Sequence, residues 1–334
     1  MKNNEIQKIV MDMSKFKSLI FLLVLLAAKT ASAQYTDVIN SNRPGKSMSA
    51  FSVGENVIQL ESGINGTHEK HQLLGNESNG INAEFNIRWG LFFEQLEFSL
   101  ELQHQTDQYK TYLGTETRNG LKQSILGAKY LLYDPYKNRK EKVNIYSWKA
   151  NHKFKWNQFI PSVAAYAGVN MNFGSPFTFA NDPKISPKLA IITQNQFSGG
   201  YVFVINIIAD KITTDYPSYG YVMTLTKGFN EKWSGFLENQ GFKSDFYSDA
   251  LIRGGAAYLI RENIQLDASI TTNFKNTPSV LYGGVGLSWR FDEAYQEVLI
   301  RSSDDSKDKD KDKKDKKKDK KKRKDEVELE KPTP

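Results

Sequence analysis

The sequence predicts an all-β protein: a transmembrane antiparallel up-and-down β-barrel of about twelve strands, followed by a disordered C-terminal tail. The first observation is strict alternation. Between Ile81 and Trp89, apolar residues occupy every second position and polar residues fill the positions between them, which is typical of strands with one apolar face. The second is that, after residue 33, no apolar run approaches the ~20 residues that a spanning helix needs. Such a chain can cross a membrane only as a closed set of strands.

The alternating runs divide the chain into expected strands of similar length. They cover residues 55–65, 80–89, 94–104, 121–133, 158–172, 187–196, 200–210, 219–227, 232–241, 250–260, 263–273 and 280–291. An even number of strands places both chain ends on one side of the membrane, which we expect to be the periplasm. Odd-numbered connections, such as 66–79 and 105–120, should then be extracellular and long, and even-numbered ones short. The connection 134–157 departs from this rule because it is long and basic.

The last expected strand, residues 280–291, shows the two predicted faces most clearly. Its lipid face carries Leu281, Gly283, Val285, Leu287, Trp289 and Phe291. Its lumen face carries Tyr282, Gly284, Gly286, Ser288 and Arg290. Glycines suit positions where a sheet bends or backbones crowd. The ending Trp289-Arg290-Phe291 resembles the closing strand of bacterial outer-membrane barrels. That resemblance implies a C-terminal signal, Trp289 and Phe291, for the barrel-insertion machinery.

Residues 1–33 have the pattern of a secretory signal peptide. Lys15 and Lys17 precede an apolar run over residues 19–28, and the small residues 31–33 precede Gln34. The apolar run is too short to span a bilayer as a helix. We therefore expect cleavage between Ala33 and Gln34, and Sec export to the outer membrane.

Residues 34–54 precede the first expected strand, and this segment lies either in the periplasm or in the barrel lumen. Pro44 and Gly45 favour a fixed turn over a place in the sheet. We favour the lumen, because apolar side chains such as Phe51 would otherwise be left in water. In the lumen, Arg43 would meet Glu61 or another inward acid.

The sequence changes character after Phe291. Residues 292–334 are rich in Lys and Asp, contain few apolar side chains, and should form a disordered periplasmic tail. The tail is either a solvated extension or a polycation that contacts anionic lipid or the cell wall. The formal net charge of +7 falls to +1 when residues 1–33 and 302–334 are set aside. A barrel with so little net charge is not expected to bind nucleic acid.

Further residues resemble a known family. Residues 41–45, Ser-Asn-Arg-Pro-Gly, and 49–63 resemble the opening of the outer-membrane transporter family named after the MetA pathway of phenol degradation. Residues 126–130, 233–238 and 265–268 are similar to the same family. The resemblance spans residues 41–291. It implies a barrel that passes small solutes, hydrophobic or aromatic ones among them, although its strand and turn motifs specify the fold better than the cargo.

We expect no catalytic, cofactor-binding or metal site. The chain has no cysteine, which excludes thiolate chemistry and ligation. His68, His71 and His104 lack a fourth ligand at a recognisable spacing, so solvated loop histidines are favoured over a metal site. Glu97 and Glu101 share one strand face about 13 Å apart, which is too far for a hydrolytic carboxylate pair.

The remaining candidates are polar side chains on inward positions of the expected strands. They are Gln59, Glu61, Glu84, Arg88, Glu97, Glu101, Lys129, Glu238, Asp267 and Arg290. These residues either neutralise one another and fill the barrel or line a narrow pore that selects solutes. The preferred function is passive passage of small solutes through a barrel surrounded by outer-membrane lipid. The alternative is a closed structural or adhesive barrel whose loops or basic tail bind partners.

Overall fold

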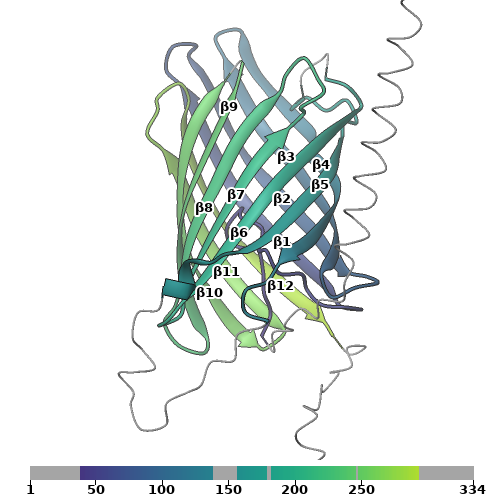
Figure 1. Cartoon of the computed structure of the whole chain (residues 1–334). Coiled ribbons are helices and arrows are strands. Elements are labelled where there is room, and N and C mark those ends of the chain that lie inside the picture. Colours follow the sequence, from purple (N-terminus) through teal and green to yellow (C-terminus); the bar gives the residue numbers. More distant parts are fainter. Residues whose placement is uncertain (1–37, 138–155, 179–181, 246, 293–334) are drawn as a thin grey trace, which may run out of the picture. The chain divides into compact units, whose positions relative to one another are not determined.

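In a computed structural model, twelve antiparallel strands form a closed barrel (Figure 1). The structure describes residues 38–137, 156–178, 182–245 and 247–292. The strands are β1 (Ile58–His71), β2 (Asn76–Gly90), β3 (Leu96–Thr111), β4 (Gly114–Tyr133), β5 (Ser162–Met171), β6 (Ile185–Phe197), β7 (Tyr201–Asp210), β8 (Ser218–Gly228), β9 (Trp233–Ser244), β10 (Ser248–Arg261), β11 (Ile264–Asn273) and β12 (Ser279–Phe291). The first and last strands close the ring, pairing from Ile58 opposite Phe291 to Lys70 opposite Ser279. The predicted fold class is confirmed.

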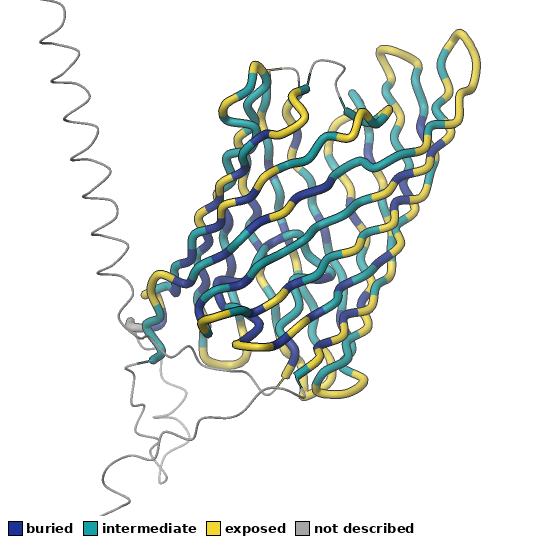
Figure 2. Tube along the Cα trace, turned by 90° about the vertical axis from the view of Figure 1, so that its right-hand side faces the viewer, coloured by how far each residue is buried: buried dark blue, intermediate teal, exposed yellow. Residues whose placement is uncertain are grey.

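Buried and exposed residues alternate along the strands, as the sequence predicts (Figure 2). On β12, Leu281 and Trp289 are exposed on the outer surface, whereas Arg290 is buried. The glycines of β12 follow the same division. A Cβ added to Gly283 would meet no atom within 4 Å, whereas one added to Gly286 would collide with a side chain inside the barrel. The outer surface of β12 is therefore apolar and its inner surface polar.

The first two hairpins are longer than the sequence predicts, and the expected loops 66–79 and 105–120 are wrong. The chain turns between β1 and β2 only at residues 72–75, and between β3 and β4 only at residues 112–113. The outward residues of these extensions are polar and exposed, among them Lys70, Asn79 and Lys110. Where a strand continues beyond lipid, its outer face meets water instead of hydrocarbon and is polar like its inner face, so the apolar alternation that marks a strand disappears there.

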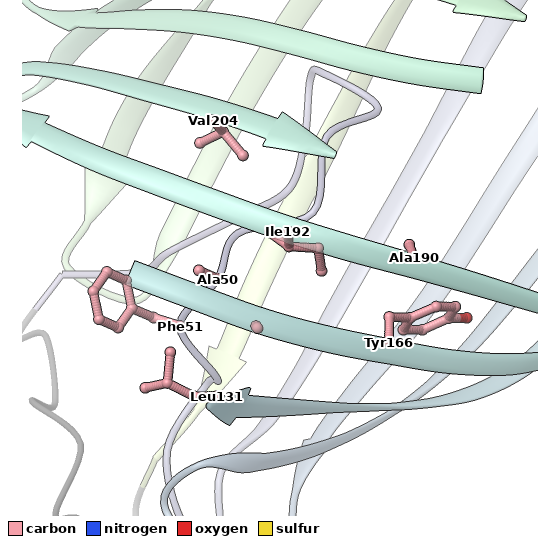
Figure 3. Packing of buried hydrophobic residues seen from close by; sticks show 8 residues of the cluster. Ala50, Phe51, Leu131, Tyr166, Ala190, Ile192 and Val204 are labelled. Atoms are coloured by element: carbon pink, nitrogen blue, oxygen red, sulfur yellow. The ribbon is translucent and has the colours of Figure 1, made fainter. Parts of the chain in front are cut away.

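An apolar cluster fills one side of the barrel interior. Ala50 and Phe51 of the N-terminal segment pack against inward residues of β4 to β7 (Figure 3). These are Leu131, Ala164, Tyr166, Ala190, Ile192 and Val204. Because this cluster makes the inner face of β7 apolar as well as its outer face, the sequence of that strand alternates poorly.

The connection between β4 and β5 is described at its two ends. Tyr136 packs against the apolar cluster, and its hydroxyl oxygen accepts a hydrogen bond from the backbone N of Gln196 at 2.8 Å. A short 3-10 helix, η1 (Trp156–Phe159), precedes β5. The rest of the unusual connection lies outside the described residues, as do the expected cleavage site at Ala33 and the tail beyond Asp292. Within the described ranges, no helix has the length and apolarity of a membrane span.

Candidate functional site

Residues 38–57 are here called the lumen segment. Residues 39–54 are buried or half-buried inside the ring of strands (Figure 1), and Val38, Glu55 and Asn56 near its ends are exposed. The hydrogen-bond partners of the segment are distributed around the whole ring: Glu61 on β1, Lys129 on β4, Asn206 on β7 and Asp267 on β11. Only the interior of a closed barrel allows one short segment to reach all of these strands. The lumen is therefore occupied by the protein's own chain.

Side chains of the barrel wall satisfy the backbone of the lumen segment. Asn206 Oδ1 accepts a hydrogen bond from Met48 N at 2.6 Å, and Asn206 Nδ2 donates to Met48 O at 3.0 Å. Gln194 Oε1 accepts from Ala50 N at 2.9 Å. Buried backbone groups without partners are costly. These wall amides therefore fix the path of a segment that has no sheet neighbour.

Arg43 forms the central ion pairs of the lumen segment. Its Nη2 and Nε lie 3.1 and 3.3 Å from the two carboxylate oxygens of Asp267, and its Nη1 lies 3.0 Å from Glu84 Oε2. Burial disfavours the charged guanidinium, but the two carboxylates more than offset it and raise the pKa of Arg43 above its ordinary value. Arg43 is therefore a permanently charged anchor, held by two of the inward acids, Asp267 and Glu84, which fits the expectation that it meets Glu61 or another inward acid.

Two glycines of the wall make room for this guanidinium. A Cβ on Gly63 of β1 would lie 2.2 Å from Arg43 Nη2, and a Cβ on Gly286 of β12 would lie 2.3 Å from Arg43 Nε. Gly63 and Gly286 are paired across the two strands that close the barrel. Glycine is required at both positions because the guanidinium lies directly against the sheet backbone.

Glu238 of β9 binds the next part of the lumen segment. Its carboxylate accepts hydrogen bonds from Lys46 N at 2.9 Å and from Ser47 N at 3.3 Å. Thr224 of β8 donates to the same carboxylate at 2.7 Å, and Arg253 of β10 forms an ion pair with it. Lys46 also extends its Nζ to Glu84, at 2.5 Å. Each of these carboxylates thus has a cationic partner.

A buried charged cluster binds both ends of the lumen segment. Arg88 lies 2.9 Å from Glu97 and 3.1 Å from Glu61, and Lys129 Nζ lies 3.1 Å from Glu97. Arg88 also donates to Asn40 O at 2.7 Å. Lys129 donates to the carbonyls of residues 49 and 51 at 2.8 and 2.9 Å, and Glu97 accepts from the backbone N of residue 53 at 3.0 Å. The cluster therefore connects the entry and exit of the segment.

Eight of the ten inward candidates contact the lumen segment directly. They are Gln59, Glu61, Glu84, Arg88, Glu97, Lys129, Glu238 and Asp267. Glu101 is half-buried on β3, and Arg290 is buried and forms an ion pair with Asp292. The candidate list from the sequence lacked further wall residues that bind the segment or its partners, among them Gln194, Asn206, Thr224, Arg253, Gln265 and Ser288.

Two cavities lie on opposite sides of Arg43 and Pro44, the only lining residues that they share. The larger, of about 350 Å³, lies between the lumen segment and β6 to β11 and has a mixed lining that includes Phe51, Gln194 and Phe236. The smaller, of about 110 Å³, lies towards the β1–β2 hairpin. The segment thus separates one space in the lumen from another.

The histidines do not come together. His68 is hydrogen-bonded to Asn79 at 2.5 Å, and His71 accepts a hydrogen bond from the backbone N of Leu74 in the turn that follows β1. His104 is exposed on β3. Within the described ranges, no group of three His, Asp or Glu side chains is placed to hold a metal ion.

Comparison with known proteins identifies the family. Residues 41–291 match a family model described as "Putative MetA-pathway of phenol degradation". The chain belongs to this family. No curated protein sequence matches it.

Several solved structures are similar to the chain. A COG4313 outer membrane channel from Pseudomonas putida F1 has a TM-score of 0.47 at 10% identity, covering 72% of this chain and 98% of that one. The translocator domain of autotransporter NalP from Neisseria meningitidis has a TM-score of 0.43 at 10% identity, covering 70% and 88%. The KdgM porin has a TM-score of 0.41 at 10% identity, covering 69% and 99%.

Proposed function

We propose that this protein is an outer-membrane channel for small solutes, and that the lumen segment closes the channel. The observation that supports the proposal is the location of residues 38–57 inside a barrel of transporter-family type. On one side of the lumen, hydrogen bonds and ion pairs hold the segment, and water can replace both kinds of contact. On the other side, Ala50 and Phe51 pack against apolar side chains of the wall. Passage of a solute then requires the segment to shift, which makes it a gate rather than a permanent part of the core.

The lining of the larger cavity suits small solutes with an apolar part. Phe51, Val204 and Phe236 contribute apolar surface, whereas Gln194 and Gln265 contribute polar groups. Cavities that combine apolar walls with a few polar groups are typical of small-molecule sites. Together with the family description, this lining supports hydrophobic or aromatic solutes as the cargo, moving passively and without covalent chemistry.

The same proposal includes a route to the membrane. The N-terminal 33 residues direct Sec export, the final strand with Trp289 and Phe291 engages the barrel-insertion machinery, and both chain ends lie in the periplasm. The Lys/Asp-rich tail follows as a solvated periplasmic extension, with contact to anionic lipid or the cell wall as the alternative. Truncation after Arg301 should leave heat-modifiable migration on a gel intact. Loss of the folded band would instead make the tail part of the barrel.

Planar-bilayer recording tests the channel proposal. The full chain should give single-channel currents that a bulky solute blocks, and deletion of residues 36–50 should raise the conductance by removing the lumen segment. An unchanged current from the folded deletion variant would mean that the segment is not the barrier. Silence from both folded proteins would favour the alternative, a closed structural or adhesive barrel.

A further inference from the structure

The smaller lumen cavity is lined by polar side chains, and two of their buried oxygen atoms have no hydrogen-bond partner among the described residues. Arg43, Pro44 and Lys46 of the lumen segment form its floor, and residues from β1 to β4 and β10 to β12 form its walls. Two wall residues, Thr67 on β1 and Asn82 on β2, are more than nine-tenths buried. Thr67 Oγ1 and Asn82 Oδ1 have no hydrogen-bond partner among the described residues. Buried polar atoms are rarely left in this state.

The orientation of the Asn82 amide is determined by its neighbours. Its Nδ2 donates to Gln105 Oε1 at 3.5 Å, and the same oxygen accepts from Lys122 Nζ at 2.9 Å. Gln105 Nε2 in turn donates to Asp107 at 3.2 Å. A flip of the Asn82 amide would therefore bring two oxygens together. Asn82 offers a carbonyl oxygen to the cavity, which requires a donor from whatever occupies it.

Lys122 enters the cavity through an irregularity of the sheet. Gln103 pairs with Gln123 and His104 pairs with Leu121, so Lys122 is left as the extra residue of a β-bulge. Bulges redirect a side chain and are frequent next to functional sites. Among the residues that the structure describes, Lys122 has no ion-pair partner, and its one hydrogen-bond partner is the neutral Gln105 oxygen.

The charges around the cavity favour an anion. The carboxylate that lines it, Glu84, is already bound by Arg43 and Lys46. Two acids behind the lining are also in ion pairs, Asp267 with Arg43 and Glu238 with Arg253, and Glu69 keeps its charge but accepts a hydrogen bond from the hydroxyl of Tyr282. Lys122 therefore provides a positive charge whose acidic neighbours already have partners.

We propose that this cavity, between the lumen segment and the bulge at Lys122, binds a small organic anion that also carries a hydrogen-bond donor, such as a hydroxycarboxylate. The ammonium groups of Lys122 and Lys46 and the hydroxyl of Thr67 donate to the carboxylate, and the hydroxyl of the anion donates to Asn82 Oδ1. The inference rests on the proposed function only in that the lumen must admit the solute. It adds a polar recognition site to a channel whose other cavity is partly apolar.

Calorimetric titration of the folded full chain in detergent with glycolate tests the proposal. Glycolate should bind with saturable heat, whereas acetate, which lacks the donor, and glycolamide, which lacks the charge, should bind more weakly. Lys122→Gln should weaken glycolate binding by at least about tenfold, equivalent to about 1.4 kcal/mol. Thr67→Val, which keeps the side-chain volume, should weaken it by about three- to tenfold.

Lys188→Gln is the matched control, because Lys188 is a buried residue of β6 that does not line this cavity. Like Lys122→Gln, it removes one positive charge from the barrel interior, but it should leave the affinity for glycolate unchanged. Absence of saturable heat, or equal weakening by both lysine variants, would overturn the inference. Channel recordings separate this inference from the proposed function. A barrel that conducts but does not bind glycolate would contradict only the anion site. A barrel that binds glycolate but never conducts would contradict only the channel proposal.

Discussion

The two sides of the lumen hold the same segment by different forces. On the side of β1, β2, β9 and β11, four carboxylates bind Arg43, Lys46 and backbone N–H groups. On the side of β4 to β7, apolar side chains pack around Ala50 and Phe51. If the segment withdrew, water would solvate the carboxylates readily. Exposure of the apolar surface to water would instead cost about 25 cal/mol of free energy per Å². Charged contacts thus specify where the segment sits, and apolar contacts oppose its departure.

The largest effect is expected from Arg43→Met. Removal of one partner from a buried ion pair costs about 3 to 5 kcal/mol, because the other charge is left uncompensated. Asp267 and Glu84 would repel each other while the segment is docked, so undocking should become easier by about two to four orders of magnitude. Single-channel recording would detect this as a larger fraction of time in the conducting state.

The double variant Arg43→Met with Asp267→Asn is the control for that prediction. It removes the uncompensated carboxylate as well as the guanidinium, so part of the closed fraction should return. Equal open fractions for the single and double variants would mean that the Arg43–Asp267 pair does not position the segment.

A somewhat smaller effect is expected from Phe51→Ala on the apolar side. Large-to-small substitutions of buried phenylalanine cost about 3 to 5 kcal/mol, and we expect the lower end because Phe51 borders a cavity into which neighbours can relax. The open fraction should rise, but less than for Arg43→Met. Phe236→Ala serves as the control, because Phe236 lines the same cavity and is not part of the apolar cluster. If Phe236→Ala raised the open fraction as much as Phe51→Ala, the apolar cluster would not be what keeps the segment docked.

The smallest effect is expected from a single methyl group. Gly286→Ala adds a Cβ that would lie 2.3 Å from Arg43 Nε, so the guanidinium must shift and its ion pairs must lengthen. Gly283→Ala adds the same methyl group three residues earlier on the outer face, where nothing lies within 4 Å. We expect a higher open fraction for the first variant and an unchanged one for the second. Identical recordings from the two variants would contradict the fit of Arg43 against the sheet.

The sequence was sufficient for the barrel and for the faces of its strands. The alternation of β12 places Trp289 outside and Arg290 inside because lipid and lumen impose opposite polarity on neighbouring residues. Alternation fails where that contrast ends. The polar tips of the first two hairpins resemble loops in sequence, because their outer face meets water rather than lipid and both faces carry polar residues.

The partners inside the lumen depended on three-dimensional proximity. An inward set of acids was recognisable, but the pairing of Arg43 with Asp267, 224 positions apart, follows from the closure of the ring. Asn206 was missed because β7 alternates poorly. One signal was available: Asn206 is a lone amide among apolar inward neighbours such as Val204 and Ile208. The roles of Gly63 and Gly286 required the position of the guanidinium, which strand patterns do not contain.

A reversible covalent lock offers the most direct test of the lumen segment as a gate. The chain has no cysteine, and Ser41 Oγ of the segment lies 2.7 Å from Ser288 Oγ of β12. Cysteines at both positions should form a disulfide, which needs Cβ atoms about 3.5 to 4.5 Å apart. The single variants Ser41→Cys and Ser288→Cys control for effects of either thiol alone.

The decisive measurement is the bilayer current of the double variant Ser41→Cys, Ser288→Cys before and after oxidation. If the segment closes the lumen and must move for solutes to pass, oxidation should cross-link the folded protein and suppress the current, and a reductant should restore it. A fully cross-linked barrel that conducts as well as the reduced one, or a folded barrel in which the two thiols never cross-link, would contradict the account.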